Sequence, residues 1–135
     1  MRFFAPAYRG RDRLCAVPAP DSTFTLDLAA PVDLPASLGP LVRGHGDRTI
    51  RLARDRAWWT TRTPDGPATI GIASVGPRIV RADGWGPGAE AAVARVPGLF
   101  SGSTDELLDA ADPRIATLAK RRPGVRVLRT GAVLE

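Results

Sequence analysis

The chain has 135 residues, 44% of them hydrophobic and 24% charged, which predicts one globular domain. No apolar run reaches the roughly 18 residues needed to cross a bilayer, which excludes an integral membrane protein. The net charge of +5 permits an acidic partner such as nucleic acid, but GC-rich coding explains the excess of arginine over lysine equally well.

Residues 1–21 are rich in Pro, Ala and Arg and show no period of 2 or 3.6, so they are predicted to be a disordered leader. They lack the continuous apolar segment of a secretion signal. Cys15 is the only cysteine, which leaves no disulfide framework and no paired-cysteine metal motif. These features favour the reducing cytoplasm.

A strand and a short helix are predicted after the leader. Phe24, Leu26 and Leu28 alternate with polar residues, which predicts a strand with one apolar face. Asp33 is the predicted N-cap of a helix, and Pro40 weakens the second half of that helix. The apolar side of the helix comprises Leu34, Leu38, Leu41 and Val42.

Four further strands are predicted near residues 49–54, 57–63, 68–73 and 78–85. The clearest turn is Asp65-Gly66, because this pair supplies the positive φ that a tight hairpin requires. Short connections between the four strands indicate an antiparallel meander.

Helices are predicted after the meander. Residues 86–88 open a helix that ends at residues 97–98, and a short helix follows from residue 103 or 104. Asp112 caps a last helix over residues 114–122. The order of strand, helix, four strands and helix predicts a two-layer α+β domain, with an antiparallel sheet covered by helices on one face.

The sequence contains no complete catalytic or metal site. His45 is the only histidine and has no second ligand at metal-binding spacing, which favours a solvated loop residue. The glycines within residues 84–88 match neither phosphate-binding fingerprint and are interpreted as the start of a helix. The carboxylates of residues 105–112 lie at helix starts, where they stabilise the helix dipoles. Any chemistry linked to this chain must therefore be completed by residues outside it.

The strongest binding signals are a tryptophan pair and a basic cluster. Trp58 and Trp59 are consecutive, so in a strand they point to opposite faces and only one can enter the core. The other packs against a partner or stacks on a base, and the lack of a second aromatic at matching spacing favours the partner. The C-terminal basic cluster either binds phosphate or complements the negative end of the last helix, and the second interpretation is favoured. The candidate contacts to DNA or to a partner domain are Trp58, Arg62, Arg121, Arg122, Arg126 and Arg129.

Three segments carry a resemblance to a known family: WWTTRTPDGPAT at 58–69, GWGPGA at 84–89 and RRPGVRVLRTG at 121–131. In this order they resemble the N-terminal part of DNA-3-methyladenine glycosylase II-like proteins, which belong to the helix-hairpin-helix superfamily of DNA glycosylases. The likeness covers residues 22–135. It departs from the usual pattern at Asp112-Pro113, where relatives often have a histidine before the proline.

The resemblance implies a β-α-β4-α domain over residues 22–129, similar to one half of a TATA-binding protein. It implies that residues 130–135 begin a helical glycosylase domain, which flips an alkylated base out of double-stranded DNA and uses an aspartate to assist hydrolysis of its glycosidic bond. That aspartate has no counterpart in this chain. No metal and no small-molecule cofactor is expected.

Two other functions compete with this accessory role. A free-standing basic module would bind nucleic acid through its arginines without catalysis, with an affinity that falls steeply as salt rises. Alternatively, an exposed tryptophan and a strand edge would dock another polypeptide.

Overall fold

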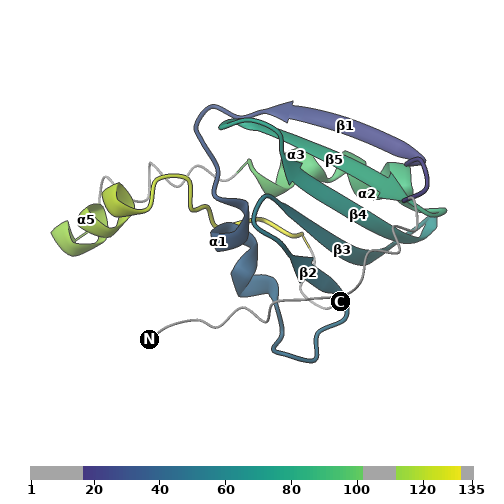
Figure 1. Cartoon of the computed structure of the whole chain (residues 1–135), viewed down its shortest axis with the longest axis horizontal. Helices are drawn as coiled ribbons and strands as arrows, with labels where there is room; N and C mark the ends of the chain where they lie inside the picture. Colours follow the sequence, from purple (N-terminus) through teal and green to yellow (C-terminus); the bar gives the residue numbers. More distant parts are fainter. Residues whose placement is uncertain (1–16, 102–111, 132–135) are drawn as a thin grey trace.

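The structure is a computed structural model that describes residues 17–101 and 112–131. Five strands form one antiparallel sheet, and α5 (Pro113–Arg121) extends away from the rest of the domain (Figure 1). The α+β class predicted from the sequence is confirmed. Within the described ranges, no helix is long and apolar enough to cross a membrane.

The strands are β1 (Ser22–Asp27), β2 (Ile50–Leu52), β3 (Arg56–Thr63), β4 (Gly66–Ser74) and β5 (Ile79–Trp85). Strands β2 to β5 pair in sequence, which confirms the predicted meander. Strand β1 pairs with β5, so the sheet order is β1-β5-β4-β3-β2. The short β2 pairs only with residues 57–59 of β3, and this leaves residues 61–63 of β3 at an edge of the sheet that β2 does not cover.

The first helical segment begins where the sequence predicts it. Asp33 accepts a hydrogen bond from the backbone N–H of Ala36 at 3.0 Å and caps α1 (Leu34–Leu38). Pro40 lies in a single 3₁₀ turn, η1 (Gly39–Leu41). The chain thus changes from an α-helix to a tighter turn where proline removes a backbone donor.

The second helical segment differs from its prediction at one point. Its first helix is α2 (Ala89–Ala94), and a second short helix, α3 (Val96–Leu99), follows directly. The prediction that residues 97–98 close the helix is therefore wrong: Pro97 lies in the first turn of α3, where a proline needs no N–H partner. The predicted helix at residue 103 or 104 lies outside the described residues.

One face of the sheet forms the core and the other is open. The alternation of side chains directs Ala57, Ile70, Ile72, Val80 and Ala82 to the same face, where all five are buried. The core is completed from the helices by Leu34, Leu38, Ala92, Val93 and Val96. The helices pack on one face of the sheet, so this face is buried in the core, whereas the other face is open.

The glycines of residues 84–88 are required by close packing. A Cβ on Gly88 would lie 2.3 Å from Oγ1 of Thr63, and a Cβ on Gly86 would lie 2.8 Å from the carbonyl oxygen of Pro67. Gly86 also has a φ of +98°, which a side chain disfavours. The N–H of Gly88 donates to the same Pro67 oxygen at 3.2 Å. This segment therefore precedes α2 and packs the start of the helix against the β3–β4 hairpin.

Candidate functional site

The open face of the sheet carries Trp58. Alternation along β3 places Trp58, Thr60 and Arg62 on this face, while Trp59 packs against the core from the other. The prediction that only one of the two tryptophans enters the core is confirmed. Trp58 is 36% exposed, and Phe24 and Ile79 of the sheet are exposed to a similar extent. The Trp58 ring is thus an aromatic surface on this face that solvent reaches.

A second tryptophan, Trp85 of β5, lies beside Trp58. Gly71 of β4 separates the two rings: a Cβ at this glycine would lie 3.1 Å from Cζ3 of Trp85 and 3.6 Å from Cδ1 of Trp58. Because Gly71 has no side chain, both indoles can converge over it. The strand register creates this pair, since Trp58 is opposite Gly71 and Trp85 is opposite Thr69. Sequence spacing alone missed it because the two rings come from different strands.

Both rings are held in place by neighbours. The indole N–H of Trp85 donates a hydrogen bond to the backbone carbonyl of Pro18 at 2.9 Å. The guanidinium of Arg56 lies 5.7 Å from the ring centroid of Trp58, a cation–π distance, and its Nε is 3.8 Å from a carboxylate oxygen of Asp55. The hydrogen bond fixes the orientation of the Trp85 indole before a ligand arrives, which lowers the entropy cost of binding.

The two halves of the open face differ in charge. The half formed by β2 and β3 carries three cations, Arg51, Arg56 and Arg62. Strands β2 and β3 themselves contain no Asp or Glu. On the other half, Arg81 is paired with Asp83 at 3.0 Å. Asp83 also accepts a hydrogen bond from the hydroxyl of Thr23 at 2.8 Å. Because Arg56 also lies 3.8 Å from the carboxylate of Asp55, the excess of positive charge beside Trp58 comes from Arg51 and Arg62.

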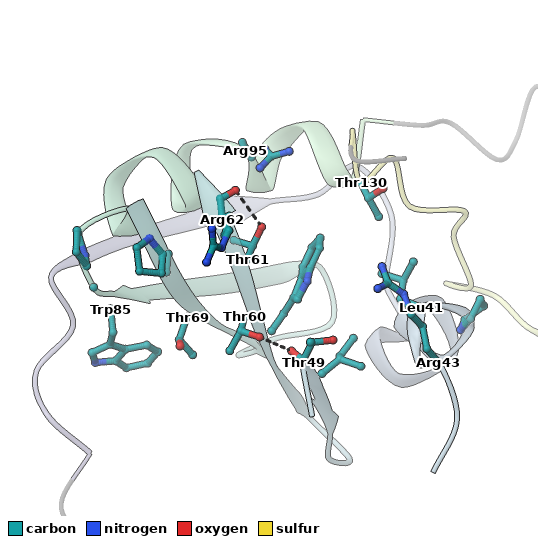
Figure 2. Close-up of a pocket in the computed structure, with 17 residues that line it drawn as sticks. Leu41, Arg43, Thr49, Thr60, Thr61, Arg62, Thr69, Trp85, Arg95 and Thr130 are labelled. Atoms are coloured by element: carbon teal, nitrogen blue, oxygen red, sulfur yellow. Dashed lines mark hydrogen bonds between the residues drawn. The ribbon is translucent and has the colours of Figure 1, made fainter. Parts of the chain in front are cut away.

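A cleft of about 1040 Å³ lies at the uncovered edge of β3. Figure 2 shows Trp85, Thr69 and Thr60 following one another along this cleft, with Arg95 of the helix layer on its other side. The apolar wall includes Leu41, Ile50, Trp59, Pro67 and Pro87. Arg43, Arg62 and Arg95 supply its charged side chains, and none of the residues that line it is acidic. The cleft is therefore apolar and basic, and it continues onto the open face through Arg62.

Asp47 holds the loop that leads into β2. Its carboxylate accepts hydrogen bonds from the backbone N–H of Arg43 at 2.9 Å and from the hydroxyl and N–H of Thr49 at 2.6 and 2.8 Å. These bonds, first among them that from the Thr49 hydroxyl, lower the pKa of Asp47 to about 2. The backbone carbonyl of Asp47 accepts from the guanidinium of Arg51. The loop is thus fixed beside the basic half of the open face.

The C-terminal arginines are not brought together with Trp58 and Arg62. Arg121 and Arg122 are exposed at the end of α5, which projects from the domain (Figure 1). Arg126 is partly buried instead: its Nη2 donates to the carbonyl of Ala30 at 2.9 Å, and its backbone N–H donates to the hydroxyl of Ser37 at 3.0 Å. It fastens the segment after α5 to α1.

Arg129 is exposed, and its backbone N–H donates to the carbonyl of Leu99 at 3.1 Å. Leu128 packs against the core, and Thr130 lines the cleft. Residues 128–131 therefore run along the domain from the core to the cleft.

Across residues 17–101 and 112–131, no three His, Cys, Asp or Glu side chains lie close enough together to hold a metal ion. His45 is exposed in the loop between η1 and β2. No family model, curated protein or solved structure matches the chain.

Proposed function

We propose that the chain is the accessory N-terminal domain of a base-excision repair protein similar to DNA-3-methyladenine glycosylase II. In this role it buttresses a helical domain that removes alkylated bases from double-stranded DNA. The reacting aspartate and the base pocket would belong to that helical domain, outside residues 1–135. No metal or organic cofactor takes part in the proposed chemistry.

The observation that carries the proposal is the arrangement of the sheet. Strand β1 is followed by α1, then by the meander β2 to β5, and then by α2, with both helices contributing to one core. The family resemblance implies a β-α-β4-α arrangement, similar to half of a TATA-binding protein, with the same order of elements, and this agreement supports the proposal. The fold alone does not specify a function, so the proposal also needs the contacts made by the resembling segments.

The three resembling segments have structural roles that a supporting domain requires. The first two meet where Gly88 donates to Pro67. The third binds α1, since the carbonyl of Gly124 accepts a hydrogen bond from the N–H of Asp33 at 2.8 Å. A Cβ on Gly124, whose φ is +93°, would lie 3.0 Å from that same nitrogen. The resemblance thus rests on residues that hold the domain together, as expected for a scaffold.

The cleft is the proposed docking surface for the helical domain. Thr130 lines it, so a helical domain that begins near residue 130 would meet the cleft directly. Its apolar wall would bury a helix face, and Arg62 and Arg95 would pair with carboxylates on that helix. Buried apolar area with charged pairs at its rim is typical of an interface between domains.

The test compares the 135-residue chain with a fusion that continues from Glu135 into the helical domain of a DNA-3-methyladenine glycosylase II. The fusion is expected to release methylated purines from alkylated duplex DNA, and the chain alone is expected to release none. Arg95→Glu should lower the activity and the melting temperature of the fusion, whereas Arg114→Glu on α5 should leave both unchanged. Release of methylated purines by the chain alone would disprove the proposal.

A further inference from the structure

We infer that the open face of the sheet is a binding platform for single-stranded nucleic acid, with Trp58 and Trp85 stacking on unpaired bases and the arginines of β2 and β3 binding the phosphates. The inference concerns the face opposite the helices, and it goes beyond the proposed function. Arg62 and Trp85 also line the cleft, so binding is tested on the 135-residue chain alone, where no helical domain can occupy them. The inference requires nothing outside residues 1–135.

The two indoles have the arrangement that base stacking needs. They come from β3 and β5 and converge over Gly71, so that their rings lie next to each other across β4. Nucleobases are flat and carry a π-face whatever their identity, which makes stacking on tryptophan tolerant of sequence. The hydrogen bond from Trp85 to Pro18 limits the rotation of the Trp85 ring, and the guanidinium of Arg56 lies over the Trp58 ring at 5.7 Å from its centroid. The platform is therefore largely formed before a ligand arrives.

The charges beside the platform match a polynucleotide backbone. Arg56, Trp58 and Arg62 share one face of β3, and neighbouring residues of such a row are about 6.8 Å apart. Arg51 lies opposite Trp58 across the β2–β3 pair. Arginine binds phosphate oxygens through its planar fork of N–H donors. The Trp58 ring thus lies next to Arg56 in this row and next to Arg51 across the strand pair, and Arg62 follows after Thr60, so phosphate-binding groups lie on both sides of the ring.

The ring faces favour a single strand over a duplex. In a duplex the bases are stacked on one another, so their faces are not available to Trp58 and Trp85 without unstacking. A single strand offers its bases at much lower cost. From the two indoles the strand would continue past Thr60 to Arg62, where the open face joins the cleft.

The experiment measures fluorescence anisotropy of the 135-residue chain with labelled oligothymidylate of about 12 nucleotides, a length within known site sizes. The matched oligouridylate and a duplex of equal length are measured alongside. We expect both single strands to bind more tightly than the duplex. Binding should weaken as salt rises. The slope of the logarithm of the binding constant against the logarithm of the salt concentration should become shallower by about 0.7 for each phosphate contact that is removed.

Two substitutions separate stacking from charge. Trp58→Ala should weaken oligothymidylate binding on the order of tenfold, and Trp58→Phe should retain part of it. Arg62→Ala should lower the salt slope, whereas Arg114→Ala on α5 should alter neither affinity nor slope. Gly71→Val keeps both indoles and all arginines but forces Trp85 to move, so it should also weaken binding.

Folding is checked for every variant by circular dichroism, and Trp58→Phe and Arg62→Ala decide the matter if Trp58→Ala or Gly71→Val does not fold. The inference is overturned if the duplex binds as tightly as the single strands. It is also overturned if the folded Trp58 and Arg62 variants bind oligothymidylate with the affinity and salt slope of the unsubstituted chain.

Discussion

Gly84 of β5 and Val93 of α2 are in such close contact that a Cβ on the glycine would lie 2.7 Å from Cγ2 of the valine. The same Cβ would lie 3.0 Å from the carbonyl oxygen of Ala89. This contact sets the distance between α2 and the sheet. It also explains why β5 has a glycine near its end, at the position that α2 approaches.

Replacing Gly84 with alanine should therefore destabilise the domain. The added methyl group must push α2 away from β5, and overpacking of this kind costs about 1–3 kcal/mol. The free energy of unfolding from urea titration is the measurement. Gly98→Ala is the matched control, because a Cβ at exposed Gly98 in α3 meets nothing within 4 Å and should be neutral or stabilise by up to about 1 kcal/mol. Equal effects of the two substitutions would contradict this account.

Removing the cap of α1 should also lower stability. Asp33→Ala deletes the carboxylate that accepts from the Ala36 N–H, a loss of about 0.5–2 kcal/mol. Asp33→Asn keeps an acceptor oxygen and should retain most of the stability. Chemical denaturation of the two variants distinguishes them, and an Asn variant as unstable as the Ala variant would show that the cap is not the cause.

Arg126 and Arg121 should behave differently although both belong to the C-terminal basic cluster. Arg126→Ala removes a charged hydrogen bond to the carbonyl of Ala30 and should destabilise the domain by about 1.5–3 kcal/mol. Arg121→Ala, at an exposed position on α5, should stay within about 0.5 kcal/mol of the unsubstituted chain. Thermal unfolding of both variants is the check. If Arg126→Ala has the same melting temperature as the unsubstituted chain, the side chain of Arg126 does not have the anchoring role assigned to it.

The loop at Asp47 should weaken in acid. The pKa of Asp47 in the folded protein, about 2, is below the ordinary aspartate value of 3.8. The hydrogen bonds to its carboxylate therefore stabilise the fold above pH 3.8, and this stabilisation is lost as the pH falls toward 2. In Asp47→Asn, this part of the pH dependence should disappear. Denaturant midpoints measured at several acidic pH values test this, and parallel pH curves for the two proteins would contradict it.

Much of the fold could be predicted from local patterns. Alternation of apolar and polar residues defines the strands, and Asp33 with its following residues defines the start of α1, because both signals depend on neighbours in the chain. The division of Trp58 and Trp59 between the two faces follows from the same period of two. Local sequence places Pro97 at a helix end but does not determine which one, because a proline is compatible with either terminus, and only packing decides between them.

The candidate sites required the tertiary structure. Arg126 does not differ from the neighbouring arginines in sequence pattern, and only the path of the chain past Ala30 makes it a partly buried anchor rather than an exposed cation. The pairing of Trp58 with Trp85 depends on strand register, which no spacing within one strand reveals. Local sequence determined which residues form strands and which side they face, because those preferences act over a few bonds. The neighbours of each side chain across the sheet were decided by long-range packing, because burial of a common core selects one register.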